Sequence, residues 1–185
     1  MLVIIDMCIK SASRGYCLDH LYATIKNLNV PFQVVKRIDE LPPSTDIDAI
    51  ILSGSPIRLT STSFSKNEAA AIGLEIYAHV ANLDKPILGI CFGFQLLNLL
   101  YRGEIEPFGR LVCERIEGLQ YCFNDYIRKQ GHGFRVQRRA IIDGRRVIVH
   151  VTKDNMVGYL FHSEATDADK HGYIKRFLKK ISKSF

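Results

Sequence analysis

Four short apolar runs constrain the fold of this 185-residue chain more than any other feature. The runs are LVIID (2–6), FQVVK (32–36), AIILSG (49–54) and PILGI (86–90). Apolar runs of this length are typical of strands that are buried on both faces of a sheet. Segments of helical character lie between them, and strands that alternate with helices are joined by right-handed crossovers into a parallel sheet. We therefore expect an α/β fold, with an open, mostly parallel, twisted sheet flanked by helices.

The segments between these runs carry helical signals. Apolar residues fall at helical spacing after the first run, at Leu18, Leu21, Tyr22, Ile25 and Leu28. A second helix is predicted over 63–81, where Ser65 and Glu68 have the spacing of a capping box. A third helix is predicted over 92–101, directly after the fourth run.

The pattern changes after about residue 130. FRVQRRAII (134–142) and RRVIVHV (145–151) flank Asp143-Gly144, a dipeptide favoured in tight hairpin turns, which predicts an antiparallel pair. MVGYLF (156–161) is a further expected strand, and a helix that starts near Asp169 is expected to cover the sheet. No linker or repeat divides the sequence, so we expect a single domain over 1–185 with an antiparallel C-terminal extension.

The five residues Gly89-Ile90-Cys91-Phe92-Gly93 join the fourth run to its helix. Their spacing is that of a nucleophile elbow with cysteine at the apex of a sharp strand-to-helix turn. Side chains two positions either side of the apex would collide, which accounts for the glycines. The N-terminus of the following helix favours thiolate, the reactive form of cysteine. The alternative is a buried core thiol between two chance glycines.

A thiolate nucleophile needs a base to carry protons and a further group to orient that base. Among the six histidines, His162 ends the run 156–161 and precedes Glu164 by two positions. His150 lies inside an apolar strand pattern, where a structural role is expected. The sequence therefore predicts that Cys91, His162 and Glu164 act together.

Three motifs in a fixed order resemble the class I glutamine amidotransferase family. They are ILSGSP, GICFGFQ and FHSE, which match the glycine-rich oxyanion loop, the GxCxGxQ elbow and the His-Glu pair of that family. The resemblance covers nearly the whole chain and implies the family's flavodoxin-like fold. The layout is most similar to the stand-alone glutaminase subunit of GMP synthetase, and anthranilate-synthase-type glutaminase subunits have a similar size and layout.

The resemblance implies a reaction and roles for three residues. Cys91 would attack the side-chain amide of L-glutamine, His162 would act as base and acid, and Glu164 would orient His162. Glutamine and water would give glutamate and ammonia through a thioester, with no metal and no organic cofactor. The ammonia would pass to a separate synthetase subunit, because the sequence contains no synthetase domain.

The resemblance also implies the residues that bind the substrate. The N–H of Phe92 and an N–H of Gly54 or Ser55 would hold the oxyanion, each worth about 3 kcal/mol in the transition state. Gln95 would contact the amino-acid end of the substrate. The family's pocket segment, SHxDxV, aligns best with 122–127. Within this segment, Phe123, Asn124 and Asp125 would also line the glutamine pocket.

Three positions depart from the family pattern. Ser55 replaces a glycine, which would cost about 1 kcal/mol or more if that position needs a positive φ angle. Ser163 replaces a proline and is expected to loosen the loop. Phe123 replaces the histidine of the pocket segment, which either leaves backbone contacts to glutamine intact or alters the pocket.

Composition and charge narrow the other classes of protein to which the chain could belong. Five cysteines without CxxC spacing predict free thiols and no structural metal site. No apolar run is long enough to span a bilayer and the N-terminus does not resemble a signal peptide, so we expect a cytoplasmic protein without membrane contact. The net charge of +6 is concentrated in 128–146 and in the C-terminal segment. These segments are expected to be solvated faces or a surface for an acidic partner, and nucleic-acid binding ranks last.

Two alternatives to a glutaminase stay open from the sequence. One is a γ-glutamyl peptide hydrolase on the same scaffold. The other is a catalytically silent binding protein that has kept the fold. The presence of Cys91, His162 and Glu164 argues against the silent protein, whereas Phe123 argues for it.

Overall fold

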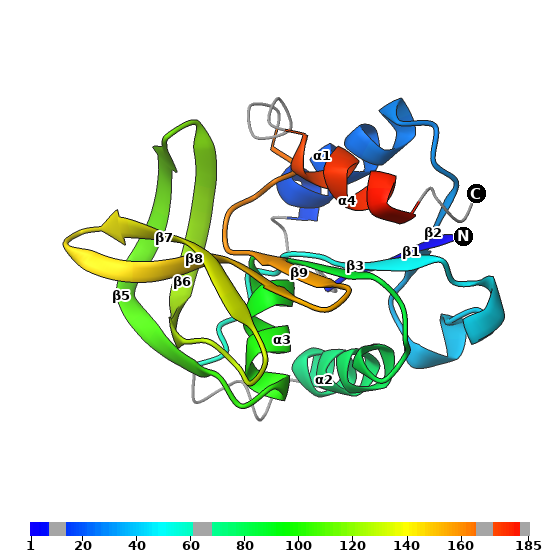
Figure 1. Ribbon diagram of the computed structural model, residues 1–185, viewed down its shortest axis with the longest axis horizontal. Coiled ribbons are helices and arrows are strands. Elements are labelled where there is room, and N and C mark those ends of the chain that lie inside the picture. Colours follow the sequence, from blue (N-terminus) through cyan, green and yellow to red (C-terminus); the bar gives the residue numbers. More distant parts are fainter. Residues whose placement is uncertain (8–13, 61–67, 166–171, 182–185) are drawn as a thin grey trace.

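The protein is built around one seven-stranded sheet, seen in a computed structural model that describes residues 1–7, 14–60, 68–165 and 172–181 (Figure 1). The strand order is β2-β1-β3-β4-β9-β8-β7. In that order the bounds are Phe32–Val35, Leu2–Ile5, Ala49–Leu52, Ile87–Ile90, Met156–Tyr159, Arg145–Lys153 and Arg135–Ile142. The first five strands are parallel to one another, and β8 and β7 continue the sheet antiparallel.

Helices cover both faces of this sheet. Figure 1 shows α1 (Arg14–Asn27) and α4 (Tyr173–Ile181) on one face, and α2 (Glu68–Ala81) and α3 (Phe92–Leu100) on the other. Two short 3₁₀ turns, η1 (Ile38–Glu40) and η2 (Ser44–Asp46), connect β2 to β3. This arrangement of a mostly parallel sheet with helices on both faces confirms the predicted α/β class. Within the described ranges, no helix is long and apolar enough to cross a membrane.

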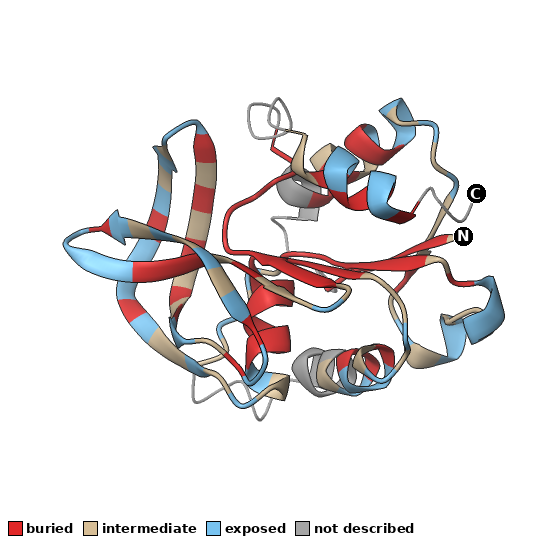
Figure 2. Ribbon diagram, viewed as in Figure 1, coloured by how far each residue is buried: buried red, intermediate tan, exposed pale blue. Residues whose placement is uncertain are grey.

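The sheet centre is the hydrophobic core. Every residue of β1, β3, β4 and β9 is buried (Figure 2). The run FQVVK is the exception among the four apolar runs, because it forms the edge strand β2, of which only Val35 is buried. A parallel strand with helices on both faces has no solvent face, so its sequence shows no polar alternation. Helix α3 is buried on nearly every side, because it contacts α2, the sheet and the hairpin described next.

A second, two-stranded antiparallel sheet was not predicted. Strands β5 (Glu104–Ile116) and β6 (Leu119–Lys129) pair with each other around a turn at Glu117 and Gly118, both with positive φ angles. Alternate residues of β6 are buried, from Leu119 to Ile127, and Figure 2 shows this alternation. The antiparallel part of the chain thus begins at residue 104, earlier than the expected boundary near 130.

The C-terminal predictions are confirmed where the structure describes them. Strands β7 and β8 form the expected hairpin, and its turn residues Asp143 (φ 48°) and Gly144 (φ 71°) have the two positive φ angles of a type I′ turn. Helix α4 buries Ile174, Phe177, Leu178 and Ile181. The expected helix start near Asp169 and the capping Ser65 lie outside the described residues.

Candidate active site

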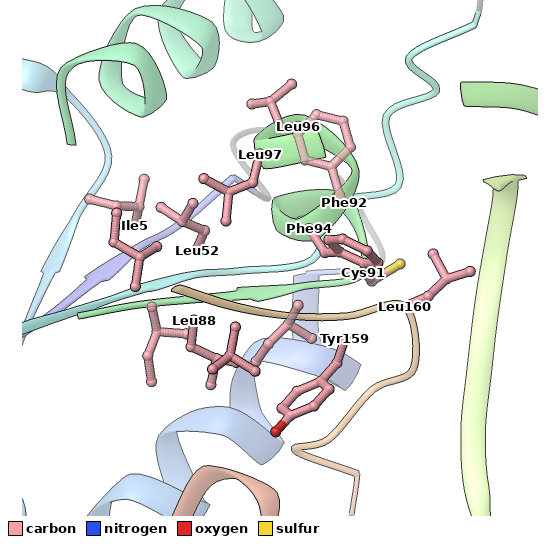
Figure 3. Packing of buried hydrophobic residues seen from close by; sticks show 14 of the residues in the cluster. Ile5, Leu52, Leu88, Cys91, Phe92, Phe94, Leu96, Leu97, Tyr159 and Leu160 are labelled. Carbon is pink, nitrogen blue, oxygen red and sulfur yellow. The ribbon is translucent and has the colours of Figure 1, made fainter. Parts of the chain in front are cut away.

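Cys91 occupies the predicted elbow. It lies between β4 and α3 with φ 50° and ψ −106°, a conformation that costs a non-glycine residue about 1–3 kcal/mol. Its N–H donates to the Tyr159 carbonyl of β9 (2.7 Å), and its carbonyl accepts the N–H of Gln95 (3.0 Å), which starts the helix. The residue is 4% exposed, and Figure 3 shows its sulfur at the edge of the apolar cluster, on the side where Leu160 lies. The partial positive charge of the α3 N-terminus therefore lies next to the thiol.

The glycines on either side of the elbow are needed because the chain approaches itself closely there. A Cβ at Gly89 would lie 2.8 Å from the Phe94 nitrogen, and a Cβ at Gly93 would lie 2.4 Å from the Leu52 carbonyl oxygen. Both distances are shorter than real Cβ contacts. The predicted collision is thus confirmed, and its partners are α3 itself and the end of β3.

A third glycine of the elbow was missed in the sequence. Gly158 of β9 is the register partner of Gly89, and a Cβ there would lie 2.2 Å from the Phe94 ring. The missing side chain at Gly158 leaves space on the sheet that the fully buried Phe94 ring fills, and the one at Gly89 leaves room for the Phe94 backbone. Phe94 therefore anchors the first turn of α3, and with it the apex residue.

His162 and Glu164 form a buried pair. The His162 Nδ1 atom lies 2.7 Å from Glu164 Oε1, and the two residues are 5% and 3% exposed. His162 follows β9, and its backbone N–H donates to the Gln120 carbonyl of β6 (2.8 Å). A carboxylate at Nδ1 directs the other ring nitrogen, Nε2, toward the site.

Cys91 and His162 meet at one backbone carbonyl. The Cys91 thiol donates to the Cys122 carbonyl oxygen over 3.3 Å, and His162 Nε2 lies 3.4 Å from the same oxygen. Gly54 at the end of β3 lies against both, because a Cβ there would be 3.2 Å from the His162 ring and 3.7 Å from the Cys91 Cβ. The three predicted catalytic residues therefore lie together at the carboxyl edge of β3, β4 and β9, where open α/β sheets place their sites.

The turn at Gly54-Ser55 does not carry the expected strain. Neither residue has a positive φ angle, so the condition under which serine would cost stability at this position is not met. Ser55 Oγ donates to the Met7 carbonyl (3.1 Å) and accepts the N–H of Ile57 (3.2 Å), which ties the turn to the end of β1. Serine thus stabilises this turn through its hydroxyl. Ser163, the second departure, is fully buried.

Two polar side chains of α3 bind β6. Gln95 Nε2 donates to the Asp125 carbonyl (2.5 Å), and Asn98 Nδ2 donates to the Lys129 carbonyl (3.1 Å). Both residues are buried. The polar Gln95 in an apolar helix is therefore explained locally by its bond to the hairpin, and Asn98 was not singled out from the sequence.

The carboxylate of Asp125 is engaged by the loop after β3. It accepts the hydroxyl of Thr60 at 2.6 Å and the Thr60 N–H at 3.1 Å, and Arg58 lies 3.7 Å away. Asp125 is 2% exposed, so this charge is held by these partners at the pocket wall. Thr60 and Arg58 were not predicted, because nothing local in the sequence links them to a residue more than sixty positions later.

A cavity of about 250 Å³ opens above the Cys91 thiol. This volume lies below the roughly 300–1,000 Å³ of drug-sized sites and suits a ligand of amino-acid size. Eight of the predicted residues line it: Gly54, Ser55, Cys91, Gln95, Phe123, Asn124, Asp125 and His162. Phe92 and Glu164 are not in the lining. Phe92 is the first residue of α3, and Glu164 lies behind the imidazole.

Phe123 fills apolar space at this cavity. It is 3% exposed and makes edge-to-face contacts with Phe108 (5.6 Å between ring centroids) and Tyr121 (6.4 Å). The residue thus belongs to the aromatic core of the hairpin. The departure from histidine therefore places an apolar ring in this aromatic packing, while the neighbouring Cys122 carbonyl still accepts the Cys91 thiol.

His150 lies away from the site, as its apolar context indicated. It is in β8, and its ring packs 4.8 Å from that of Tyr159. Burial, with Arg138, Arg176 and Lys180 nearby, lowers the pKa of His150 to about 4. The ring is therefore neutral at physiological pH, in keeping with a structural role.

Open α/β sheets that present a nucleophile at such an elbow form a broad class of proteins, to which this fold belongs. Within that class, the sequence profile described as "Glutamine amidotransferase class-I" matches residues 13–181. The chain belongs to the class I glutamine amidotransferase family, which confirms the resemblance drawn from the three motifs.

Relatives with curated descriptions resemble this chain in sequence, and the aligned part covers between half and nearly all of it. The chain is 26% identical over 206 aligned positions to a subunit of the glutamine-hydrolysing GMP synthase of Methanocaldococcus jannaschii, covering 99% of this chain and 96% of that protein. It is 31% identical over 192 positions to the Methanococcus maripaludis strain C6 protein of the same name, covering 92% and 95%. The match to the strain S2 protein, 30% over 95 positions, spans only 50% of this chain and 44% of that protein.

Solved structures share the fold at low identity. A structure described as that of a putative GMP synthase subunit from Thermoplasma acidophilum has a TM-score of 0.70 and 17% identity, covering 99% of this chain and 94% of that one. A glutamine amidotransferase from Thermotoga maritima has a TM-score of 0.62 and 13% identity, covering 99% and 84%. These structures confirm the predicted fold.

Proposed function

We propose that this protein is a glutaminase that hydrolyses L-glutamine to glutamate and ammonia through a thioester on Cys91. The observation that carries the proposal is the convergence of the Cys91 thiol and His162 Nε2 on one carbonyl oxygen, with Glu164 2.7 Å from the other ring nitrogen. Family membership supports glutamine as the substrate. The cavity above the thiol has the size of an amino-acid site.

The first half of the reaction forms the thioester. Rotation of the Cys91 side chain exchanges the Cys122 carbonyl for Nε2 of His162, which takes the thiol proton. The thiolate attacks the carboxamide carbon of glutamine. The N–H of Phe92 and an N–H of the Gly54-Ser55 turn hold the resulting oxyanion, each donor contributing about 3 kcal/mol. Nε2–H then protonates the leaving nitrogen, and ammonia departs.

The second half releases glutamate. Neutral His162 removes a proton from water, and the hydroxide attacks the thioester carbon. Collapse of this intermediate expels the Cys91 thiolate, which recovers a proton from the imidazolium. Glu164 holds Nδ1–H in both halves and stabilises each imidazolium. Every proton step uses groups of this chain.

The ammonia is passed to a separate synthetase protein in the cytoplasm. The support is the name of the relatives, which are subunits of a glutamine-hydrolysing GMP synthase and align with nearly the whole chain in two cases. The protein that receives the ammonia is therefore a GMP-synthetase-like partner. The basic segment at 128–146 is a surface through which an acidic partner would bind.

Ammonia release from L-glutamine by the purified protein, alone and with a candidate synthetase, tests the proposal. The Cys91→Ala variant removes the nucleophile, and we expect its rate to fall to background. A glutamine-like diazo ketone should add its mass to Cys91 in the wild type. Equal rates for the two proteins, or turnover of γ-glutamyl peptides without turnover of glutamine, would refute the assignment.

A further inference from the structure

Two cysteines outside the catalytic set face each other across the β5–β6 hairpin. Cys113 and Cys122 are register partners in the antiparallel pair, and their sulfur atoms lie 3.1 Å apart. Both are free thiols. The catalytic roles of Cys91, His162 and Glu164 do not account for this arrangement of two thiols.

The backbone geometry of the pair suits a disulfide. Directly opposed residues of antiparallel strands have Cα atoms about 4.5–5.5 Å apart. Disulfides span Cα separations of about 4.4–6.8 Å, so the strands need not separate for the bond to form. The sulfur atoms must approach each other by about 1 Å to reach the bonded length of about 2.05 Å.

The two thiols differ in access to solvent. Cys113 is exposed, whereas Cys122 is half-buried at the cavity wall. Burial, together with the hydrogen bond to Cys113, raises the pKa of the Cys122 thiol to about 12. An oxidant in solution therefore reaches Cys113 first, and Cys122 is the resolving thiol.

Cys122 connects this pair to the catalytic centre. Its carbonyl oxygen is the atom on which the Cys91 thiol and His162 Nε2 converge, at 3.3 and 3.4 Å. Its side chain lines the same cavity as Cys91. Drawing the Cys122 sulfur toward Cys113 therefore changes the cavity wall directly beside the carbonyl that positions the nucleophile.

We propose that Cys113 and Cys122 form a reversible disulfide that slows the reaction at Cys91, with hydrogen peroxide as the oxidant. The Cys113 thiolate attacks one peroxide oxygen, the O–O bond breaks, and the departing hydroxide takes up a proton to leave as water. The Cys122 sulfur then attacks the Cys113 sulfenic sulfur, the S–O bond breaks, and the Cys122 proton leaves with the hydroxide as a second water. Two thiols lose two electrons and two protons, and a small dithiol reverses the step.

The effect on catalysis rests on the proposed glutaminase function, whereas formation of the bond does not. In a reducing compartment the dithiol is the resting form and the disulfide is transient. A shift of about 1 Å near reacting groups can cost about 100-fold in rate. We therefore expect glutamine hydrolysis to fall at least tenfold in the oxidised form and to recover on reduction.

Tryptic mapping gives a direct readout of the bond. Cleavage after Arg110, Arg115 and Arg128 places the two cysteines in separate peptides, LVCER and IEGLQYCFNDYIR. After brief peroxide treatment of the whole protein, these peptides should be joined, with a loss of about 2 Da for two hydrogens. Absence of this joined species, or joining of Cys122 to Cys91 instead, would overturn the proposal.

Activity of matched variants completes the test. Cys113→Ser should retain the activity of the reduced wild type and lose activity in peroxide more slowly than the wild type, because only direct oxidation of Cys91 remains. Arg115→Ser, on the same face of the same strand with both thiols kept, should remain sensitive. Equal peroxide inactivation of Cys113→Ser and wild type would overturn the switch. A reduced wild type that hydrolyses no glutamine would refute the glutaminase, while peptide mapping would still decide the disulfide.

Discussion

Replacing Gly93 by alanine should damage both the fold and the nucleophile. The added Cβ would lie 2.4 Å from the Leu52 carbonyl oxygen, about 0.6 Å inside the 3.0 Å limit of real Cβ contacts. Leu52 cannot retreat, because it is fully buried and its strand pairs with β1 and β4 on either side. The start of α3 must therefore move outward, and it carries the residue after Cys91.

The cost follows from that displacement. Overpacking of this kind costs about 1–3 kcal/mol, and alanine regains up to about 1 kcal/mol of helix propensity. We expect Gly93→Ala to lower the free energy of unfolding by about 2 kcal/mol, or the melting temperature by about 4–8 °C for a chain of this size. Because the elbow moves with the helix, labelling of Cys91 by a glutamine-like electrophile should slow at least tenfold.

Substitution of a second glycine, Gly144, serves as a control that distinguishes steric crowding from backbone strain. Gly144 has a φ of 71° and nothing within 4 Å of an added Cβ. Gly144→Ala should therefore cost about 1 kcal/mol through its backbone alone and leave Cys91 reactivity unchanged. Thermal unfolding and Cys91 labelling are compared for both variants. If Gly93→Ala melts no earlier than Gly144→Ala and labels at the wild-type rate, the account of the elbow is wrong.

Three further changes probe separate parts of the site and fold. Glu164→Gln should slow ammonia release at least 100-fold without loss of folding by circular dichroism, because a neutral amide no longer stabilises the His162 imidazolium; an unchanged rate would contradict the triad. Thr60→Val removes one bond to buried Asp125 and should cost about 1–3 kcal/mol in urea unfolding and raise KM for glutamine; an unchanged unfolding curve and KM would show that this bond is unimportant. His150 has a pKa of about 4 in the fold against about 6.5 unfolded, so the unfolded chain binds the proton first and stability is lost as pH falls from about 6.5 to about 4. Relative to the wild type, His150→Gln should gain about 2 kcal/mol in free energy of unfolding at pH 4 compared with pH 7, a figure reduced because the ring is partly exposed. Parallel curves of unfolding free energy against pH for the two proteins would refute this.

Local patterns were sufficient where one short segment determines its own environment. Three of the four apolar runs form buried parallel strands, because a strand covered on both faces has to be apolar throughout. The run FQVVK also forms a parallel strand, but it lies at the edge of the sheet with only Val35 buried. The elbow at Cys91 was predictable because its glycines, apex and helix start fall within five residues. The hairpin turn at Asp143-Gly144 was predictable for the same reason, since both residues adopt the positive φ angles that the dipeptide favours.

The β5–β6 hairpin was missed because its pattern is interrupted. Register shifts occur at the start of β5 and between Pro107 and Val112, so the alternation of buried and exposed residues breaks within the first strand. The clean alternation in β6, with its turn at Glu117-Gly118, would have been the usable signal. Gly158 and Thr60 were missed for a different reason, because each acts on a residue that is distant in the sequence.

Backbone atoms of β6 explain how the pocket tolerates Phe123. The Gln120 carbonyl accepts the His162 N–H, the Cys122 carbonyl accepts the Cys91 thiol, and the Asp125 carbonyl accepts the side chain of Gln95. None of these bonds depends on the side chain at 123, which packs among aromatic rings instead. Side chains along β6 can therefore change while the strand still positions the nucleophile and the base. Cys122 supplies one of these carbonyls, at which the Cys91 thiol and His162 meet, which is why a bond from its side chain to Cys113 would act next to the site.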